Sequence, residues 1–423
     1  MYLTRLALDD FRSWQNLLID VTPGITVLYG ANGLGKTNIV EAIEVLATGT
    51  SHRAHSTIPL IRAGQQKATI RANVINNDES QTTYEISLAA KGANRARING
   101  GKSVYMRDVV GQIPVVAFAP DDQQLVTQDP SLRRSFINQA GALLNPDYYA
   151  ILQQYMQVAK QRVALLKTLQ HQDEGFDISA TLQNLEIWTG QFIELGLRLT
   201  LAREQIIHQL AEPFTRIYSR LTSGDTSARI IYAPSFEEVQ EQTPQESTFQ
   251  GSYHQETVGS EDITEHDIQS IKANISEHFR RIYAGEVARG QNLIGPHRDD
   301  VLIELHGFSA KEYASNGEAW TLALALKMAL CEVLEQQLQS EPIIILDDVF
   351  AQLDMNRREQ IMEFAQQKTQ VFITMAALRD LPDGMEAQLI DVERCAQEQI
   401  ASQHDEMMHL VANMVKQKSQ EQA

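Results

Sequence analysis

The sequence predicts an α/β fold whose sheet-forming part is split along the chain by a helical insertion. Residues 2–120 alternate short apolar strand patterns with turns. Residues 131–222 instead carry apolar side chains at the spacing of long helices, and strand patterns resume after residue 300. The second strand-rich part holds acidic motifs that the first part lacks. One domain interrupted by an insertion therefore explains this order better than two independent domains.

The first strand-rich part is expected to cover residues 1–130. Its apolar runs are bounded by turn residues, and Asn99-Gly100 is typical of a tight hairpin turn. A helical pattern begins shortly after the third strand. The expected strands are 2–8, 17–21, 25–29, 68–74, 82–88 and 114–118.

Residues 131–290 are expected to form the helical arm or insertion subdomain. An antiparallel helical hairpin and a plain helical subdomain explain the pattern equally well. Pro213 is predicted to interrupt the longest helix. Residues 234–266 are polar, with few periodic apolar side chains, which predicts a flexible insertion. The expected helices are 131–143, 147–169, 180–221 and 267–288.

Residues 291–394 are expected to complete the sheet-forming domain, and residues 395–423 to form a polar tail. Aliphatic runs and helical patterns alternate again in the first of these segments. The expected strands are 301–305, 343–346 and 371–374, and the expected helices are 317–338 and 357–367.

Composition limits the functions that the chain can have. The net charge is −18, so a DNA-binding role would need a local basic patch instead of an overall basic balance. Cys331 and Cys395 are the two cysteines, which argues against a disulfide framework and favours a reducing cytoplasm. Met1–Phe11 lacks the apolar core of a signal peptide, and no apolar run is long enough to suggest a membrane span.

A glycine-rich segment, residues 30–37, matches the phosphate-binding pattern G-x-x-x-x-G-K-[ST] without a mismatch. A strand pattern enters it and a helical pattern leaves it, as this loop requires. Backbone N–H groups of such a loop bind phosphate oxygens, Lys36 is predicted to reach the β- and γ-phosphates, and Thr37 to bind Mg²⁺. The predicted ATP-binding residues here are Gly30, Ala31, Asn32, Gly33, Leu34, Gly35, Lys36 and Thr37.

Two acids follow the aliphatic run 343–346. An acid at the carboxyl end of a buried strand can help to hold Mg²⁺, and a second can polarise a water molecule for attack on the γ-phosphate. We assign the metal role to Asp347, through water, and the general-base role to Asp348. Alone, this pattern would also suit a solvent-exposed strand end. Residues 351–354 follow closely, either as a loop across a dimer interface or as a simple helix cap by Asp354.

Ser315 and Gly317 open the next long helix and are predicted to bind phosphate. A serine beside a flexible glycine at a helix N-terminus can donate hydrogen bonds to phosphate oxygens. The competing interpretation is an ordinary helix cap, with Glu318 three positions after the capping Ser315. In the ABC-type ATPase architecture, a helix at this position covers the γ-phosphate bound by a second subunit. We therefore expect Ser315 and Gly317 to act in trans.

Together these segments resemble the RecF family, bacterial recombination-repair ATPases related to SMC proteins and ABC ATPases. The resemblance covers nearly the whole chain. The segments that carry it are Asp10–Trp14, Gly33–Asn38 with Glu41–Ile43, Phe118–Asp122 leading to Pro130 and Arg133-Arg134, Gly295–Asp300 and Leu346–Asp354.

The resemblance implies a P-loop, ABC-type ATPase head split by its helical insertion, with ATP and Mg²⁺ as ligands. It implies a homodimer that forms on ATP binding and binds DNA at single-strand/double-strand junctions and gaps. It also implies that RecO and RecR type proteins act with the chain to load RecA, and that slow ATP hydrolysis works as a switch. The location implied is the cytoplasm, without membrane attachment.

Glu318 departs from the family pattern, which commonly has Gln after the Ser-x-Gly segment. A carboxylate close to the γ-phosphate of another subunit costs Coulomb energy unless it points away or caps its own helix. We therefore expect Glu318 to affect the strength of ATP-driven dimerisation and not nucleotide binding itself.

Short basic clusters are the candidate DNA contacts. Solvated surface or intramolecular ion pairs explain any one of them at least as well. Because no motif for reading base edges is visible, we expect binding to DNA shape and backbone. The predicted contacts are Arg53, Arg95, Arg97, Lys102, Arg133 and Arg134.

Two other functions share these motifs. A transporter ATPase subunit usually has a histidine after the strand that follows Asp348, where Thr374 stands here, and has a shorter separation between Lys36 and Asp347. An SMC-like scaffold would need ATP binding but hardly any hydrolysis; its long coiled coil would exceed residues 131–222. DNA affinity measured with and without ATP separates these alternatives from a repair ATPase.

Overall fold

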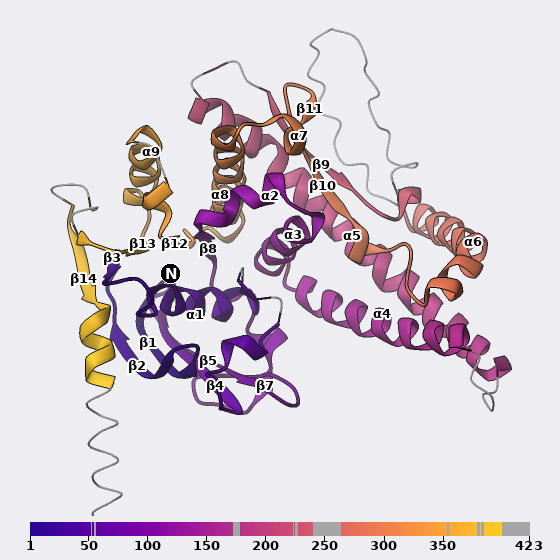
Figure 1. Ribbon diagram of the computed structural model, residues 1–423, viewed down its shortest axis with the longest axis horizontal. Helices are drawn as coiled ribbons and strands as arrows, with labels where there is room; N and C mark the ends of the chain where they lie inside the picture. Colours follow the sequence, from indigo (N-terminus) through magenta and orange to yellow (C-terminus); the bar gives the residue numbers. More distant parts are fainter. Residues whose placement is uncertain are drawn as a thin grey trace, which may run out of the picture. The chain divides into compact units, whose positions relative to one another are not determined.

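The structure is a computed structural model, and it confirms the α/β class (Figure 1). It divides into two compact units, residues 1–123 with 320–423 and residues 124–319. This division differs from the predicted bounds, because the strand predicted at 301–305 for the sheet-forming domain belongs to the second unit. The described residues are 1–51, 53–54, 56–171, 178–222, 224, 227–239, 264–352, 355–378, 381 and 385–399.

A parallel sheet forms the core of the first unit, with the strand order β14-β3-β13-β12-β8. Every residue of β12 and β13 is buried, as expected for central strands covered on both faces. Because all the pairings are parallel, the carboxyl ends of β3, β12 and β13 lie at one edge of the sheet. The strands are β3 Gly24–Tyr29, β8 Val115–Phe118, β12 Ile343–Asp347, β13 Gln370–Met375 and β14 Ala387–Asp391.

Helices of the first unit include α1, Lys36–Thr48, whose burial is nearly complete from Ile39 onward. The helix α8, Asn316–Leu338, contributes a long apolar face that includes the buried Cys331. The helix α9, Met355–Gln366, lies between β12 and β13 in the chain.

An antiparallel sheet completes this unit, with the order β2-β1-β4-β5-β6-β7. Buried and half-buried residues alternate along most of β4 and β5, so one face packs inward and the other is partly exposed to solvent. The side chain of Gln370, fully buried on β13, donates to and accepts from the backbone of Leu3 at 2.8 Å, which ties the two sheets together. The strands are β1 Tyr2–Phe11, β2 Trp14–Asp20, β4 Lys67–Ile75, β5 Gln81–Ala89, β6 Arg95–Ile98 and β7 Val104–Tyr105.

The second unit is mainly helical. In it α4 and α5 pack against each other, and a sheet of order β11-β10-β9 lies against α5 (Figure 1). Short 3₁₀ turns also occur, including Pro296–Arg298. The elements are α2 Gln124–Thr127, α3 Pro130–Leu144, α4 Tyr148–His171, α5 Ile178–Thr222, β9 Ala228–Ala233, α6 Glu265–Arg289, β10 Asp300–Leu305, β11 Phe308–Ser309 and α7 Ala310–Tyr313.

Two sequence predictions for this unit were wrong. Pro213 does not interrupt α5, which continues from Ile178 to Thr222. The neighbouring Phe214 is fully buried, and such packing can hold a helix together across one missing backbone hydrogen bond. The strand β9 was not predicted. Most of the polar segment 234–266, and most of the tail after residue 395, lie outside the described residues.

None of the described helices combines the length and the apolar character that crossing a membrane requires.

Candidate nucleotide-binding site

The glycine-rich loop connects the end of β3 to the start of α1, as predicted. Gly30, Gly33 and Gly35 have φ values of 146°, 87° and 95°, which side-chain-bearing residues rarely adopt. Gly35 is the N-cap residue of α1 and has no side chain with which to cap it. The first N–H groups of α1 are therefore arranged like those that bind phosphate in other loops of this type.

The segment between β1 and β2 packs behind the loop. Trp14 donates from Nε1 to the Gly35 carbonyl oxygen at 3.1 Å, and Asn38 donates to Ser13 Oγ at 2.8 Å. A Cβ atom on Gly35 would lie 2.6 Å from Ser13 Oγ and 2.9 Å from Trp14 Nε1. The position thus requires glycine for space as well as for backbone conformation.

Glu41 on α1 binds Arg12, which lies in the same segment between β1 and β2. Its carboxylate is fully buried and accepts two hydrogen bonds from Arg12, at 2.8 and 2.5 Å, and one from Ser51 Oγ at 2.5 Å. A buried carboxylate needs such compensation. This pairing explains why Arg12 and Glu41 accompany the loop in the sequence.

Lys36 is folded over the loop. Its ammonium donates to the carbonyl oxygens of Gly30 at 2.7 Å and Ala31 at 3.0 Å, and to Asn32 Oδ1 at 3.3 Å. Burial lowers the pKa of Lys36, while the carboxylates of Asp348 and Asp347 act in the opposite direction. All three bonded oxygens are uncharged, and phosphate oxygens would be stronger acceptors for this ammonium.

Asp347 joins three elements at the carboxyl edge of the parallel sheet. Its Oδ1 accepts hydrogen bonds from Thr37 Oγ1 at 2.9 Å and from Thr374 Oγ1 at 2.6 Å. The register pairs Asp347 with Thr374 directly, on neighbouring strands. The structure therefore brings together Thr37 and Asp347, which the sequence pointed to separately.

Thr374 is the site residue whose role the sequence reasoning missed. In the sequence it stands out only as the residue at a position where transporter ATPases usually have a histidine. Besides bonding Asp347, its hydroxyl accepts a hydrogen bond from the backbone N–H of Asp348 at 2.9 Å. A threonine at the end of a buried strand next to the acidic strand was the signal that could have identified it.

Asp348 leaves the strand with an unusual backbone. Its φ of 51° is in the left-handed region, which is uncommon for residues other than glycine and asparagine. Its carboxylate lies close enough to Lys36 to influence the pKa of that ammonium. Outliers of this kind gather at functional sites.

Ser315 and Glu318 form a capping box at the start of α8. Glu318 Oε2 accepts from Ser315 Oγ at 2.7 Å and from the Ser315 backbone N–H at 2.8 Å, while Ser315 Oγ accepts from the Glu318 N–H at 3.3 Å. The bonds from Ser315 lower the pKa of Glu318. The helix-cap interpretation is thus what the structure describes; binding of phosphate in trans by Ser315 and Gly317 stays a prediction.

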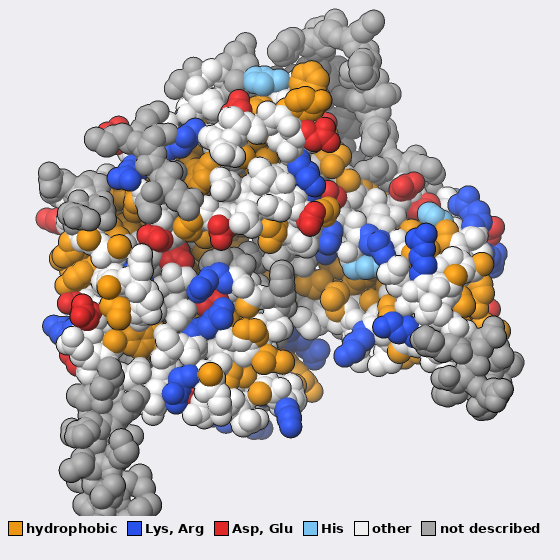
Figure 2. Space-filling view, in the orientation of Figure 1, with side chains coloured by type: hydrophobic (Ala, Val, Ile, Leu, Met, Phe, Trp, Pro, Cys, Tyr) orange, Lys and Arg blue, Asp and Glu red, His pale blue; other side chains and the backbone are white. Residues whose placement is uncertain are grey.

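The side chains of the predicted DNA contacts in the first unit differ in whether they interact with other residues of the protein. Arg53 is partly engaged, 3.5 Å from Glu41 Oε2 and 3.3 Å from Asn38 Oδ1. Arg97 lies 3.6 Å from Glu85, whereas Arg95 and Lys102 are exposed. On the face that Figure 2 shows, basic and acidic side chains are interspersed, without one continuous basic surface.

Arg133 and Arg134 stabilise the second unit. Arg133 is 5% exposed and donates to both carboxylate oxygens of Asp300, at 2.6 and 3.0 Å, and to two backbone carbonyls. Arg134 donates to the Asp299 carbonyl at 2.7 Å, and burial lowers its pKa. The structure thus gives Arg133 a structural role in place of the predicted DNA contact, because its donors point inward.

The segment Gly295–Asp300 is the centre of a buried polar network. Asp299 is 1% exposed and accepts from Arg203 at 2.8 Å, from the Ser235 N–H at 2.8 Å and from the Tyr232 hydroxyl. His297 Nδ1 lies 2.7 Å from the Tyr155 hydroxyl. The conspicuous sequence of this segment is therefore explained by the packing of the second unit.

Comparisons with known proteins show the family of the chain. The family described as RecF/RecN/SMC N terminal domain matches residues 2–401. The DNA replication and repair protein RecF of Bifidobacterium longum subsp. infantis is 52% identical over 94% of this chain and 90% of its own length. The protein of the same name from Bifidobacterium adolescentis is 53% identical over 93% and 91%.

Solved structures point the same way. A structure of the recombination mediator protein RecF-ATPrS in the RecFOR pathway superposes with a TM-score of 0.76 and 25% identity, over 92% of this chain and 96% of the other. The match to the family model, residues 2–401, spans both compact units. The chain belongs to the RecF family of DNA replication and repair proteins.

Proposed function

We propose that this protein is an ATP-dependent DNA-binding protein of recombinational repair and replication-fork maintenance. It binds single-strand/double-strand junctions or gaps as a homodimer that forms on ATP binding, and it helps RecO and RecR type proteins to load RecA. Its slow, DNA-stimulated ATP hydrolysis works as a switch. The observation that carries this proposal is the convergence of Thr37, Asp347 and Thr374 beside the glycine-rich loop. The repair names of the relatives support the biological role.

ATP binding rests on the loop. The N–H groups at the start of α1 hold the phosphates, and Lys36 exchanges its bonds to Gly30 and Ala31 for bonds to the β- and γ-phosphate oxygens. The exchange replaces uncharged acceptors with charged ones, so it favours the bound state. The residues proposed to contact ATP are those of the loop, residues 30–37.

Thr37 and Asp347 suit Mg²⁺. A hydroxyl and a carboxylate are the hard oxygen ligands that this ion prefers, and the two oxygens already lie 2.9 Å apart. Among the described residues no cluster of three or more acidic, histidine or cysteine side chains could hold a metal alone. A site completed by water and substrate phosphates is usual for Mg²⁺. When bound, the ion would neutralise phosphate charge during hydrolysis.

Hydrolysis requires a base, and Asp348 is the proposed one. Asp348 directly follows Asp347 in the chain, and its backbone N–H donates a hydrogen bond to Thr374 Oγ1 at 2.9 Å. In this role the Asp348 carboxylate orients a water molecule and accepts its proton as the γ-phosphate is attacked. Removal of the carboxylate should therefore stop turnover and leave ATP binding in place.

Dimerisation is proposed to use Ser315 and Gly317 against the γ-phosphate of a second copy. In the single chain the Ser315 hydroxyl donates to Glu318. Dimer closure must then redirect this hydroxyl to phosphate, with the charge of Glu318 nearby. We infer that Glu318 weakens ATP-driven dimerisation in this protein.

DNA binding that depends on ATP tests the proposed function. Affinity for gapped duplex DNA is measured by fluorescence anisotropy with ATP, with ADP and without nucleotide, at matched ionic strength. We expect tighter binding with ATP, and we expect Lys36→Ala to remove the difference. Equal affinity in all three conditions would contradict the proposal and favour an SMC-like scaffold whose DNA contacts ignore the nucleotide.

A further inference from the structure

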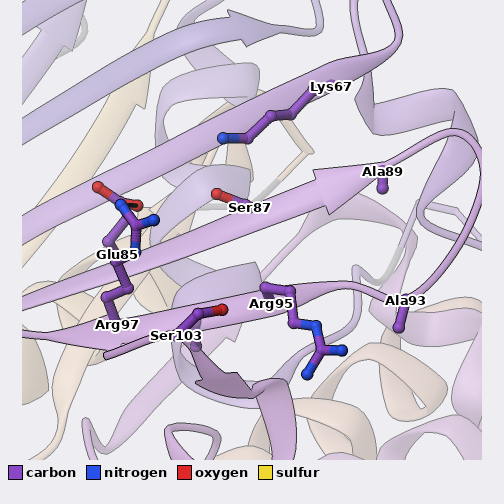
Figure 3. A pocket seen from close by; sticks show the side chains of 9 residues that line it. Lys67, Glu85, Ser87, Ala89, Ala93, Arg95, Arg97 and Ser103 are labelled. Carbon is purple, nitrogen blue, oxygen red and sulfur yellow. Dashed lines mark ion pairs between the residues drawn. The ribbon is translucent and has the colours of Figure 1, made fainter. Parts of the chain in front are cut away.

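The solvent-facing side of the antiparallel sheet carries a pocket of about 250 Å³. It lies over β4, β5 and β6, and its lining includes Lys67, Ser87, Arg95 and Ser103 (Figure 3). These residues are all in the first compact unit. The nucleotide-binding residues are not among those that line it, so the pocket is a separate site.

Strand register explains the shape of the pocket. Ser87 on β5 pairs with Thr69 on one side and with Arg95 on the other, while Ala89 pairs with Lys67. Lys67 and Arg95 therefore stand on the two strands that flank β5. Between them β5 presents the short side chains of Ser87 and Ala89, which leaves room between the two long cations (Figure 3).

The charges on this face are unequally compensated. Arg5 pairs with Asp20, and Arg71 pairs with both Asp9 and Glu85. Within the described part of the chain, the ion pairs found include none for Lys67 or Arg95. Glu85 and Arg97 also line the pocket, and the Glu85 carboxylate is paired with Arg71 and Arg97. Lys67 and Arg95, on either side of a hollow with a hydroxyl at its floor, therefore form a site for an anion.

Tyr105 orients one of these cations. The guanidinium carbon of Arg95 lies 4.4 Å from the centre of the Tyr105 ring, and that of Arg107 lies 4.7 Å from it. Register places Tyr105 directly opposite Arg95. A guanidinium that rests on an aromatic face keeps its N–H edge available for oxygen acceptors. The ring thus restricts the motion of Arg95 without using its donors.

We propose that this pocket binds a phosphodiester group of the DNA backbone, with Lys67 and Arg95 as its charged ligands and Ser87 and Ser103 as hydroxyl donors. The proposal rests on the proposed function, since it names one surface with which the protein holds DNA. Phosphate is favoured over a base edge because it brings a full negative charge to Lys67 and Arg95, whereas the acceptors on a base edge are uncharged. Binding here is therefore independent of base sequence.

The test is a salt titration of DNA binding by Lys67→Ala, Arg95→Ala and the double variant, with ATP present. Each phosphate contact contributes about 0.9 to the slope of log K against log salt for duplex DNA. We expect each single variant to lower the slope by about one, and the double variant by about two. Arg5→Ala is the matched control, since it removes an equal charge from the same face at a position paired with Asp20. It should keep the wild-type slope.

Unchanged affinity and slope in the double variant, with ATP-dependent DNA binding intact in the wild type, would overturn the pocket and leave the proposed function standing. A wild type that binds DNA equally with and without ATP would instead contradict the proposed function. Calorimetry with inorganic phosphate provides a third arm. Tight phosphate binding that the double variant loses, with DNA binding unchanged, would assign the pocket to a free anion and reject DNA as its ligand.

Discussion

At the scale of single residues, the hydroxyl of Thr374 connects Asp347, the proposed Mg²⁺ ligand, with Asp348, the proposed general base. It donates to Asp347 Oδ1 at 2.6 Å and accepts from the Asp348 N–H at 2.9 Å. Asp347 is 4% exposed, so its carboxylate depends on hydrogen bonds from the protein, and Thr374 supplies one of them. Thr374 should therefore control how well Mg²⁺ and ATP bind together.

Thr374→Val keeps the shape of the side chain and removes the hydroxyl. We expect Mg²⁺-dependent ATP affinity to fall by about 1.5–3 kcal/mol, the usual contribution of a hydrogen bond to a charged group. Thr374→Ser retains a hydroxyl and should bind ATP almost normally. Titration of a fluorescent ATP analogue at several Mg²⁺ concentrations measures the effect. The role assigned to Thr374 fails if the Val and Ser variants depend on Mg²⁺ alike.

We predict that the free energy of unfolding depends on pH through His297. Burial lowers the pKa of His297 in the folded protein, so the neutral ring is favoured there. In the unfolded chain the pKa is about 6.5. As the pH falls below this value the unfolded state takes up a proton first, and the free energy of unfolding decreases until the lower folded pKa is passed.

Denaturant unfolding at pH 7.5 and at pH 5.5 tests this. The wild type should lose stability between the two, and His297→Gln should lose less, whatever its stability at pH 7.5. If the wild type and His297→Gln lost equal stability between the two pH values, groups other than His297 would cause the pH dependence.

The positions of the candidate site residues were predictable from sequence where a motif fixes them. The loop between a strand and a helix, Asp347 at the end of a buried strand and the capping alternative for Ser315 and Glu318 all followed from short-range patterns. Arg133 did not, because its partner Asp300 is 167 positions away in the chain. A basic side chain looks the same in sequence whether it meets solvent or a buried carboxylate.

At the scale of elements, the loop between β3 and α1 offers an internal comparison. Gly33 and Gly35 both have positive φ, but a Cβ atom meets nothing within 4 Å at Gly33 and meets Ser13 Oγ at 2.6 Å at Gly35. We expect Gly35→Ala to weaken ATP binding more than Gly33→Ala, because it must also displace the segment that supports α1. Calorimetric titration with ATP analogues measures both. Equal losses would mean that backbone strain alone matters.

The N-terminus of α8 carries the second element-scale prediction. Gln at position 318 can still accept from Ser315 in a capping box, but it carries no charge. Glu318→Gln should therefore tighten the ATP-driven dimer roughly thirtyfold, the effect of about 1 kcal/mol of repulsion at each of its two sites, between charges a few ångström apart in a water-like medium. Ser315→Ala is the contrasting variant and should weaken the dimer. Light scattering over a protein dilution series gives both values, and an unchanged Glu318→Gln dimer would separate Glu318 from dimer closure.

Helices and strands with an amphipathic pattern were predicted from the sequence. The prediction failed where contacts with residues far away in the chain determine the secondary structure. The helices α3, α4 and α6 and the central strands were expected close to their observed positions. The strand β9 was missed because its partner β10 begins only at Asp300, so the pairing is not a local property. The continuity of α5 through Pro213 likewise depends on packing that the sequence does not display.

At the scale of the whole molecule, the fold combines an acidic chain with a proposed DNA-binding role. A net charge of −18 repels DNA, so binding must depend on local sites such as the Lys67–Arg95 pocket. The proposed site residues are divided between the two compact units, with the loop and the acidic strand in one and Ser315 in the other. The central claim is that ATP joins two copies of this chain, each supplying part of the other's site.

Molecular mass in solution tests this claim most directly, measured by light scattering for Asp348→Asn with ATP, with ADP and with ATP plus gapped DNA. This variant should bind ATP but not hydrolyse it, so the dimer should persist with ATP, bind gapped DNA and be absent with ADP. Lys36→Ala serves as the control and should remain monomeric throughout. A single mass for Asp348→Asn under all conditions, with ATP binding verified, would contradict the account.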